Sequence, residues 1–112
     1  MNITYRLADK QDIPFLTDLR IKLDHYTCLR DGLNLENEEQ LRENIRNTLS
    51  EDLNKSIFFY IALDEGNIIA CGGLVILKVL PYHLIPSGIK GYITSVYTEE
   101  QYRRLALQKN NI

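Results

Sequence analysis

The order of apolar and polar positions at the start of the chain predicts a strand followed by a helix. Ile3, Tyr5 and Leu7 alternate with polar residues, a period of two that is typical of a strand with one buried face. Asp12 then precedes an isoleucine and Pro14. This order predicts that Asp12 caps the helix, and a proline is well tolerated in the opening turn.

Two amphipathic helices are predicted in the next part of the chain. The first spans about residues 13–25, because leucines and isoleucines gather on one side and the pattern fades beyond Tyr26. Residues 27–37 have no clear period, and they are interpreted as a loop or a ragged continuation of the helix. The second helix runs from Glu38 to about Asn54, because apolar residues recur there at four-residue steps: Leu41, Ile45, Leu49 and Leu53.

The sequence of the second half of the chain predicts three strands, which make up most of a sheet. Residues 56–63 and 68–77 are β-prone and flank a turn cluster, which indicates a hairpin. Gly72-Gly73 inside its second strand predicts a bulge or a close approach by another group. Residues 81–88 contain two prolines and form a loop, residues 91–97 resume as a strand, and a helix starts near Glu99. The expected class is α+β, an α/β-type sheet with flanking helices.

Composition narrows the possible functions. The 112 residues fit one domain, residues 1–112, and the formal charge is −2 from 13 basic and 15 acidic residues, so nucleic acid is not expected as a partner. The longest apolar stretch falls short of the ~20 residues of a membrane helix, and no secretory signal opens the chain, so a cytoplasmic protein is expected. Cys28 and Cys71 lack metal-ligand or redox spacing. They are interpreted as buried or incidental thiols, and no metal site is predicted.

Two stretches of the sequence resemble the GNAT superfamily of acetyl-CoA-dependent N-acetyltransferases. Residues 3–16 are similar to the first strand and first helix of the family, with Asp12-Ile13-Pro14 in the matching place. Residues 91–104 are similar to its fourth strand and the start of its cofactor loop. The resemblance implies the N-terminal portion of the GNAT fold: a strand, two helices, three strands and the start of a third helix.

The resemblance also implies where acetyl-CoA binds. In the family the fourth strand splays from its neighbour and its backbone pairs with the pantetheine arm. The matching main-chain groups here are those of Val96 and Thr98, with an N–H near Tyr97 to polarise the thioester carbonyl.

The next part of the family site is a glycine-containing loop at a helix N-terminus, which holds the pyrophosphate. The match begins at Arg103, and Arg104 is a second cation for the phosphates; a solvated basic pair is the alternative reading. Ala106 and Gln108 stand where the family usually has small residues. The chain ends before the strand and helix that follow in the family, so an incomplete domain is expected.

No catalytic residue can be assigned from the sequence. His25 and His83 are candidate bases acting through water, although an ordinary structural role fits both. The direct transfer mechanism of the family needs no thiol on the protein, so Cys71 is expected to be packed.

Two functions follow from the resemblance. The first is transfer of an acetyl group from acetyl-CoA to an amine, which could belong to a small molecule, a peptide or an antibiotic. The alternative is an inactive, truncated relative that serves as an interaction or dimerisation module. Loss of the last elements would expose a sheet edge and apolar helix faces, so a homodimer is expected.

Overall fold

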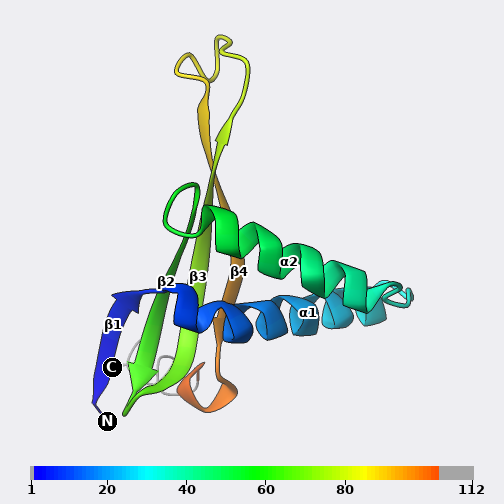
Figure 1. Cartoon of the computed structure of the whole chain (residues 1–112), viewed down its shortest axis with the longest axis vertical. Helices are drawn as coiled ribbons and strands as arrows, with labels where there is room; N and C mark the ends of the chain where they lie inside the picture. The colour runs from blue at the N-terminus through cyan, green and yellow to red at the C-terminus, as the bar shows by residue number, and fades with distance from the viewer. Residues whose placement is uncertain (1, 104–112) are drawn as a thin grey trace.

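The computed structural model describes residues 2–103 as a four-stranded sheet and two long helices (Figure 1). The strands lie side by side in chain order, and each pairs antiparallel with the next. The element bounds are β1 Ile3–Leu7, a 3-10 turn Lys10–Asp12, α1 Ile13–Arg30, α2 Glu38–Asp52, β2 Ile57–Asp64, β3 Asn67–Lys78 and β4 Ile89–Thr98. Residues 100–103 are helical. The predicted α+β class and element order are confirmed.

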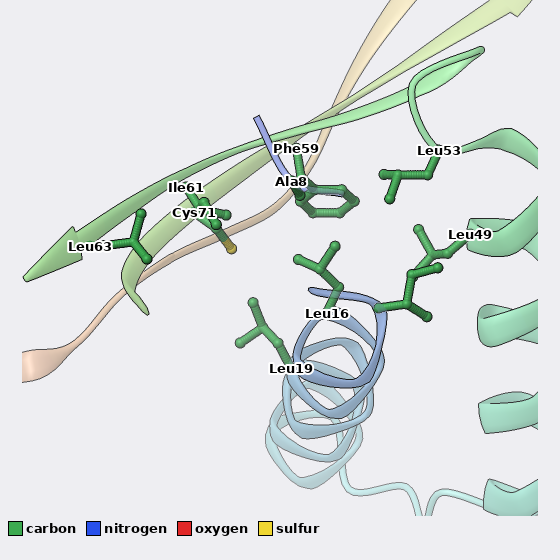
Figure 2. Packing of buried hydrophobic residues seen from close by; sticks show 10 residues of the cluster. Ala8, Leu16, Leu19, Leu49, Leu53, Phe59, Ile61, Leu63 and Cys71 are labelled. Carbon is green, nitrogen blue, oxygen red and sulfur yellow. The ribbon is translucent and has the colours of Figure 1, made fainter. Parts of the chain in front are cut away.

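Both helices pack on one face of the sheet, and the core lies between the helices and that face (Figure 2). Phe59, Ile61 and Leu63 alternate along β2 and point toward the helices, which is the period of two that a half-buried strand requires. The helices contribute mainly leucines to this core: Leu16, Leu19, Leu49 and Leu53, the last directly after α2. Burial of this apolar surface is the main force that holds the two layers together.

The first helix is longer than the sequence predicted. Its expected end at about His25 is wrong, because α1 continues to Arg30. Of the two interpretations of residues 27–37, the continued helix holds as far as Arg30 and a loop follows it. The last turns carry no apolar pattern since they project beyond the sheet, and Tyr26 and Leu29 are exposed there.

The predicted N-cap is right in position and wrong in its side-chain role. Asp12 is the N-cap residue of α1, but its side chain makes no capping bond to the helix. Its carboxylate instead accepts hydrogen bonds from the Asp9 N–H at 2.9 Å and from the Arg6 guanidinium at 2.7 and 3.0 Å. Asp9 caps the preceding 3-10 turn, with its side chain accepting from the Gln11 N–H. Pro14 lies in the opening turn of α1, as predicted.

The glycine pair of β3 lies at a β-bulge and beside the Phe59 ring. The register between β3 and β4 shifts between Cys71 and Gly73, so a bulge is present. A Cβ on Gly73 would lie 2.7 Å from the Phe59 ring. The sequence prediction of a bulge or a close approach at Gly72-Gly73 is therefore confirmed in both forms.

None of the helices within residues 2–103 is long and apolar enough to cross a membrane.

Candidate functional site

The bulge in β4 is the most unusual backbone feature of the sheet. Tyr97 pairs with Cys71 and Thr94 pairs with Gly73, so two residues of β4, Ser95 and Val96, stand opposite Gly72 alone. Ser95 has φ +51°, in the left-handed region that residues with a side chain rarely adopt. Val96 is 66% exposed. The bulge thus bends β4 and turns Val96 toward solvent at the middle of the strand.

Two side chains from other elements contact the bulge. Arg20 of α1 donates to the Thr94 hydroxyl at 3.3 Å and to the Ser95 hydroxyl at 3.4 Å. The Cys71 thiol donates to the Ser95 carbonyl at 3.4 Å. Burial raises the pKa of this thiol to about 11, so it stays protonated at neutral pH and acts as a donor. The predicted packed role of Cys71 agrees with this geometry.

A cleft opens beside the bulge, between the helices and the sheet. Its volume is about 350 Å³, within the range of small-molecule sites. Helices α1 and α2 form one wall, and all strands except β1 contribute to the other. The lining residues are Leu16, Arg20, Leu41, Asn44, Ile45, Thr48, Leu49, Ile57, Phe59, Val75, Thr94 and Ser95.

β4 is the outer strand of the described sheet, and beyond the bulge its free edge includes Thr98. The Glu99 N–H donates to the Ile69 carbonyl at 2.8 Å. Because inward and outward backbone groups alternate along an antiparallel edge, the N–H and C=O of Thr98 point away from β3. The Thr98 carbonyl accepts a hydrogen bond from Arg103 Nε at 2.6 Å. An extended ligand can therefore reach backbone groups here, in competition with Arg103.

A second hollow, of about 520 Å³, lies at this end of β4. Two cations flank the Tyr97 ring in it, with Lys22 Nζ 5.1 Å and Arg103 Cζ 5.8 Å from the ring centroid. Glu99 and Glu100 also line the hollow, so its acidic and basic side chains balance. The order along β4 is thus the apolar cleft, the bulge, the open edge and then the two cations.

The structure brings together the predicted residues that it describes. Val96, Tyr97, Thr98 and Arg103 are consecutive or nearly so at the end of β4, and Tyr97 packs against the core. The other predicted cofactor residues, Arg104, Ala106 and Gln108, lie outside the described residues. Tyr102, for which the sequence indicates no chemical role, donates from its hydroxyl to Asp64 at 2.5 Å.

The two histidines lie in different places. His25 is exposed on α1 and contacts the Glu38 carboxylate, which links α1 to α2. His83 lies in the loop beyond β3 and stacks edge-on against Tyr82, with ring centroids 5.6 Å apart. That loop projects away from the helices (Figure 1). Neither histidine lines the cleft or the second hollow. Within residues 2–103 no cluster of three acidic, histidine or cysteine side chains could hold a metal ion.

Sequence reasoning missed Arg20, Cys71 and Lys22 as neighbours of β4. The helical pattern places Arg20 on the solvent-facing side, since it lies among other charged residues. Its hydrogen bonds reach 74 and 75 positions along the chain. No local pattern reports a contact of that range.

No protein-family model matches the sequence, and no curated protein is significantly similar to it. Solved structures do match. A predicted acetyltransferase from Clostridium acetobutylicum, solved with acetyl-CoA, is 29% identical, with a TM-score of 0.68 over 91% of this chain. This chain spans 63% of the length of that protein.

Two further structures support the same fold. A GCN5-related N-acetyltransferase from Ralstonia eutropha JMP134 is 18% identical, with a TM-score of 0.77 over 97% of this chain and 70% of its own. A possible acetyltransferase from Clostridium difficile 630 is 17% identical, with a TM-score of 0.65 over 98% of this chain and 66% of its own. The resemblance seen in the sequence is confirmed at the level of fold: residues 2–103 have the front part of the GNAT acetyltransferase fold.

Proposed function

We propose that this chain carries the cofactor strand and the acceptor cleft of an N-acetyltransferase, which moves the acetyl group of acetyl-CoA to a primary amine. The observation that carries the proposal is the β4 bulge at Ser95 and Val96. It stands between an apolar cleft on one side and an open strand edge with cations on the other. The similar Clostridium acetobutylicum protein, solved with acetyl-CoA, supports the choice of cosubstrate.

The pantetheine arm is proposed to pair with β4 as an additional strand would, through the outward backbone groups of Val96 and Thr98. The Thr98 carbonyl is bonded to Arg103 in this structure. We propose that Arg103 leaves this carbonyl when the cofactor arrives and turns to its phosphates. Lys22, across the Tyr97 ring, supplies a second positive charge at that end.

The proposed reaction is a direct transfer. The neutral amine nitrogen attacks the carbonyl carbon of the thioester, and an N–C bond forms as the carbonyl oxygen takes up negative charge. A main-chain N–H of β4 near Tyr97 stabilises this charge. The C–S bond then breaks, CoA leaves as a thiolate, and the proton lost by the amine goes to the thiolate or to solvent. Positioning and polarisation are the contributions of the protein.

A homodimer is part of this proposal. It is supported by apolar side chains that remain exposed on the sheet face away from the helices, among them Tyr5, Leu7 and Tyr60. The acceptor is proposed to be a small amine or a peptide amine, and the proposed compartment is the cytoplasm.

Calorimetric titration with acetyl-CoA tests the cofactor site. We expect micromolar binding, weakened about tenfold in Arg103→Ala because a charge-assisted contact is lost. Arg46→Ala on α2 removes the same charge away from β4 and should leave binding unchanged. Absence of binding at millimolar acetyl-CoA would contradict the proposal and favour the interaction module instead.

Turnover is tested separately by detecting free thiol while a panel of amines is supplied. Release of CoA that depends on both acetyl-CoA and an amine would support transfer. Binding of acetyl-CoA with no amine-dependent thiol would leave a cofactor-binding module without the proposed activity.

A further inference from the structure

The walls of the cleft beside the bulge are mainly apolar on both sides. From the sheet they are formed by Ile57, Phe59 and Val75. From the helices they are formed by Leu16, Leu41, Ile45 and Leu49. A ligand that enters this space exchanges water for hydrocarbon over most of its surface, which favours apolar groups.

Charge in the cleft is scarce and already compensated. Among the described residues that line it, Arg20 is the only one with a charge. Its guanidinium pairs with Asp24 at 3.3 Å and also donates to the Thr94 and Ser95 hydroxyls. No carboxylate of the described lining faces the space. Each ammonium group that a ligand brings into this space loses its water without gaining an opposite charge, which is costly, so a ligand with one amine is favoured over a ligand with several.

Polar side chains reach the described lining of the cleft from two places. Arg20, Thr94 and Ser95 gather at the β4 end, next to the bulge, where hydrogen bonds join them. Asn44 and Thr48 of α2 are the other polar side chains of this lining. The volume of about 350 Å³ suits a small molecule and is too small for a folded partner.

We infer that the acceptor is a small monoamine whose far end is an uncharged alkyl or aryl group. This inference rests on the proposed function, and it narrows the acceptor class. The apolar end lies among the side chains of α2, β2 and β3, and the amine points to Thr94 and Ser95, where the thioester is proposed to arrive. Polyamines and aminoglycosides, which carry several ammonium groups, do not match this cleft.

The test compares two amines of one shape on the full chain. Cyclohexylmethylamine and (tetrahydropyran-4-yl)methylamine differ by one ring oxygen, and kanamycin serves as the polycation. Binding is followed by two-dimensional NMR of the ¹⁵N-labelled chain. We expect cyclohexylmethylamine to bind about tenfold more tightly than its ether analogue. Shifts should concentrate on Ile45, Val75 and Ser95.

A matched pair of variants assigns the preference to the cleft. Val75→Thr keeps the shape of the side chain and puts a hydroxyl in the wall. The preference for cyclohexylmethylamine over its ether analogue should therefore fall several-fold. Leu77→Thr makes a similar change on the same face of β3, outside the lining, and should leave the preference intact. Equal binding of the two ring amines, tighter binding of kanamycin, or shifts remote from the cleft would overturn the inference.

Because binding is read without acetyl-CoA, the two proposals fail separately. Selective binding of the apolar amine with no acetyl transfer would refute the proposed activity and leave the cleft assignment standing. Transfer to polar and apolar amines at equal kcat/KM would refute the cleft assignment and leave the activity standing.

Discussion

Gly73 occupies a position on β3 where a larger side chain has no room. A Cβ there would lie 2.7 and 2.8 Å from two atoms of the Phe59 ring and 3.0 Å from the Thr94 methyl group. Phe59 is 5% exposed and belongs to the core, so its ring cannot retreat without disturbing other contacts. The residue that faces the helices at this point must therefore be glycine.

Gly73→Ala is expected to destabilise the protein by about 1–3 kcal/mol, the usual range for overpacking a core. Urea unfolding measures the change. Gly72→Ala is the control, because a Cβ at the neighbouring glycine meets nothing within 4 Å and the backbone conformation is ordinary. Equal destabilisation by both substitutions would show that loss of glycine itself, and not the Phe59 contact, matters.

Asp12 makes stability depend on pH. The hydrogen bond from Arg6 is the main cause that lowers the pKa of this carboxyl below its ordinary value of 3.8. Since the folded state favours the charged form, the stabilisation is complete above that value and is lost as the pH falls through the lower, folded pKa. Asp12→Asn should therefore be less stable than the unmodified chain at pH 7, and the difference should shrink below pH 3.8.

Urea unfolding of both chains between pH 7 and about pH 3 checks this prediction. Asp31→Asn is the control, because it removes the same charge from an exposed residue at the end of α1 whose ion-pair partner is the neighbouring Arg30. A stability difference that stays constant across the range would contradict the role of the Arg6 contact.

Residue chemistry was predictable from the sequence only where the cause is local. Two aspartates precede α1, and the sequence did not reveal that Arg6 would engage Asp12 and leave capping of the 3-10 turn to Asp9. The role of Gly72-Gly73 was predictable, because two adjacent glycines weaken a strand unless a bulge or a close contact requires them. The roles of Arg20 and Cys71 were not, since they depend on contacts with β4 that only the folded chain creates.

At the scale of elements, the bounds were predictable where burial marks one face and were missed where an element continues beyond the core. β2, β3 and α2 were predicted within a few residues, because each carries a periodic apolar face over the core. β1 was also placed correctly, but the buried face predicted from Tyr5 and Leu7 is wrong, since both side chains are exposed on the face away from the helices. The extent of α1 was underestimated, because its last turns leave the sheet and lose the pattern on which the prediction depends. Helical hydrogen bonding does not require an apolar face, so the helix continues where the signal stops.

β4 yields a prediction about backbone groups that no ordinary side-chain substitution would test. Thr98→Pro removes an N–H that points to the open edge. Because this N–H does not bond to β3, no ladder bond is lost, and a proline is tolerated at such a position on an edge strand. If the pantetheine arm pairs there, acetyl-CoA binding should weaken about tenfold through the lost hydrogen bond. Calorimetry measures the affinity, and circular dichroism verifies the fold.

Ile89→Pro is the control for this substitution; it also removes an exposed hydrogen bond from the Ile89 N–H to the Ser87 hydroxyl at 3.2 Å. Val79 donates to the Gly88 carbonyl at 2.8 Å, so alternation also turns the backbone groups of Ile89 away from β3. Ile89 lies at the opposite end of β4 from Thr98. Equal loss of acetyl-CoA binding in both variants would argue against a cofactor edge at Thr98.

For the whole molecule, the two faces of the sheet differ. Both long helices cover the face that carries Phe59 and Ile61, as Figure 2 shows. The opposite face presents Tyr60, Leu7 and Tyr5, which are 57%, 50% and 65% exposed. The sequence predicted a sheet with flanking helices and could not assign their side, because β2 carries apolar residues in both alternating sets.

An exposed apolar face of this kind favours self-association, since pairing two copies removes it from water. We expect a dimer at micromolar concentration by light scattering, and Tyr60→Lys should convert it to a monomer by placing a charge in the contact. Tyr92→Lys is the control: Tyr92 is 56% exposed, and its pairing with Val75 places it on the face that bears the helices. A monomeric unmodified chain, or equal dissociation in both variants, would show that this face is not the dimer contact. Retained acetyl-CoA binding in monomeric Tyr60→Lys would further show that the cofactor edge of β4 functions within a single copy.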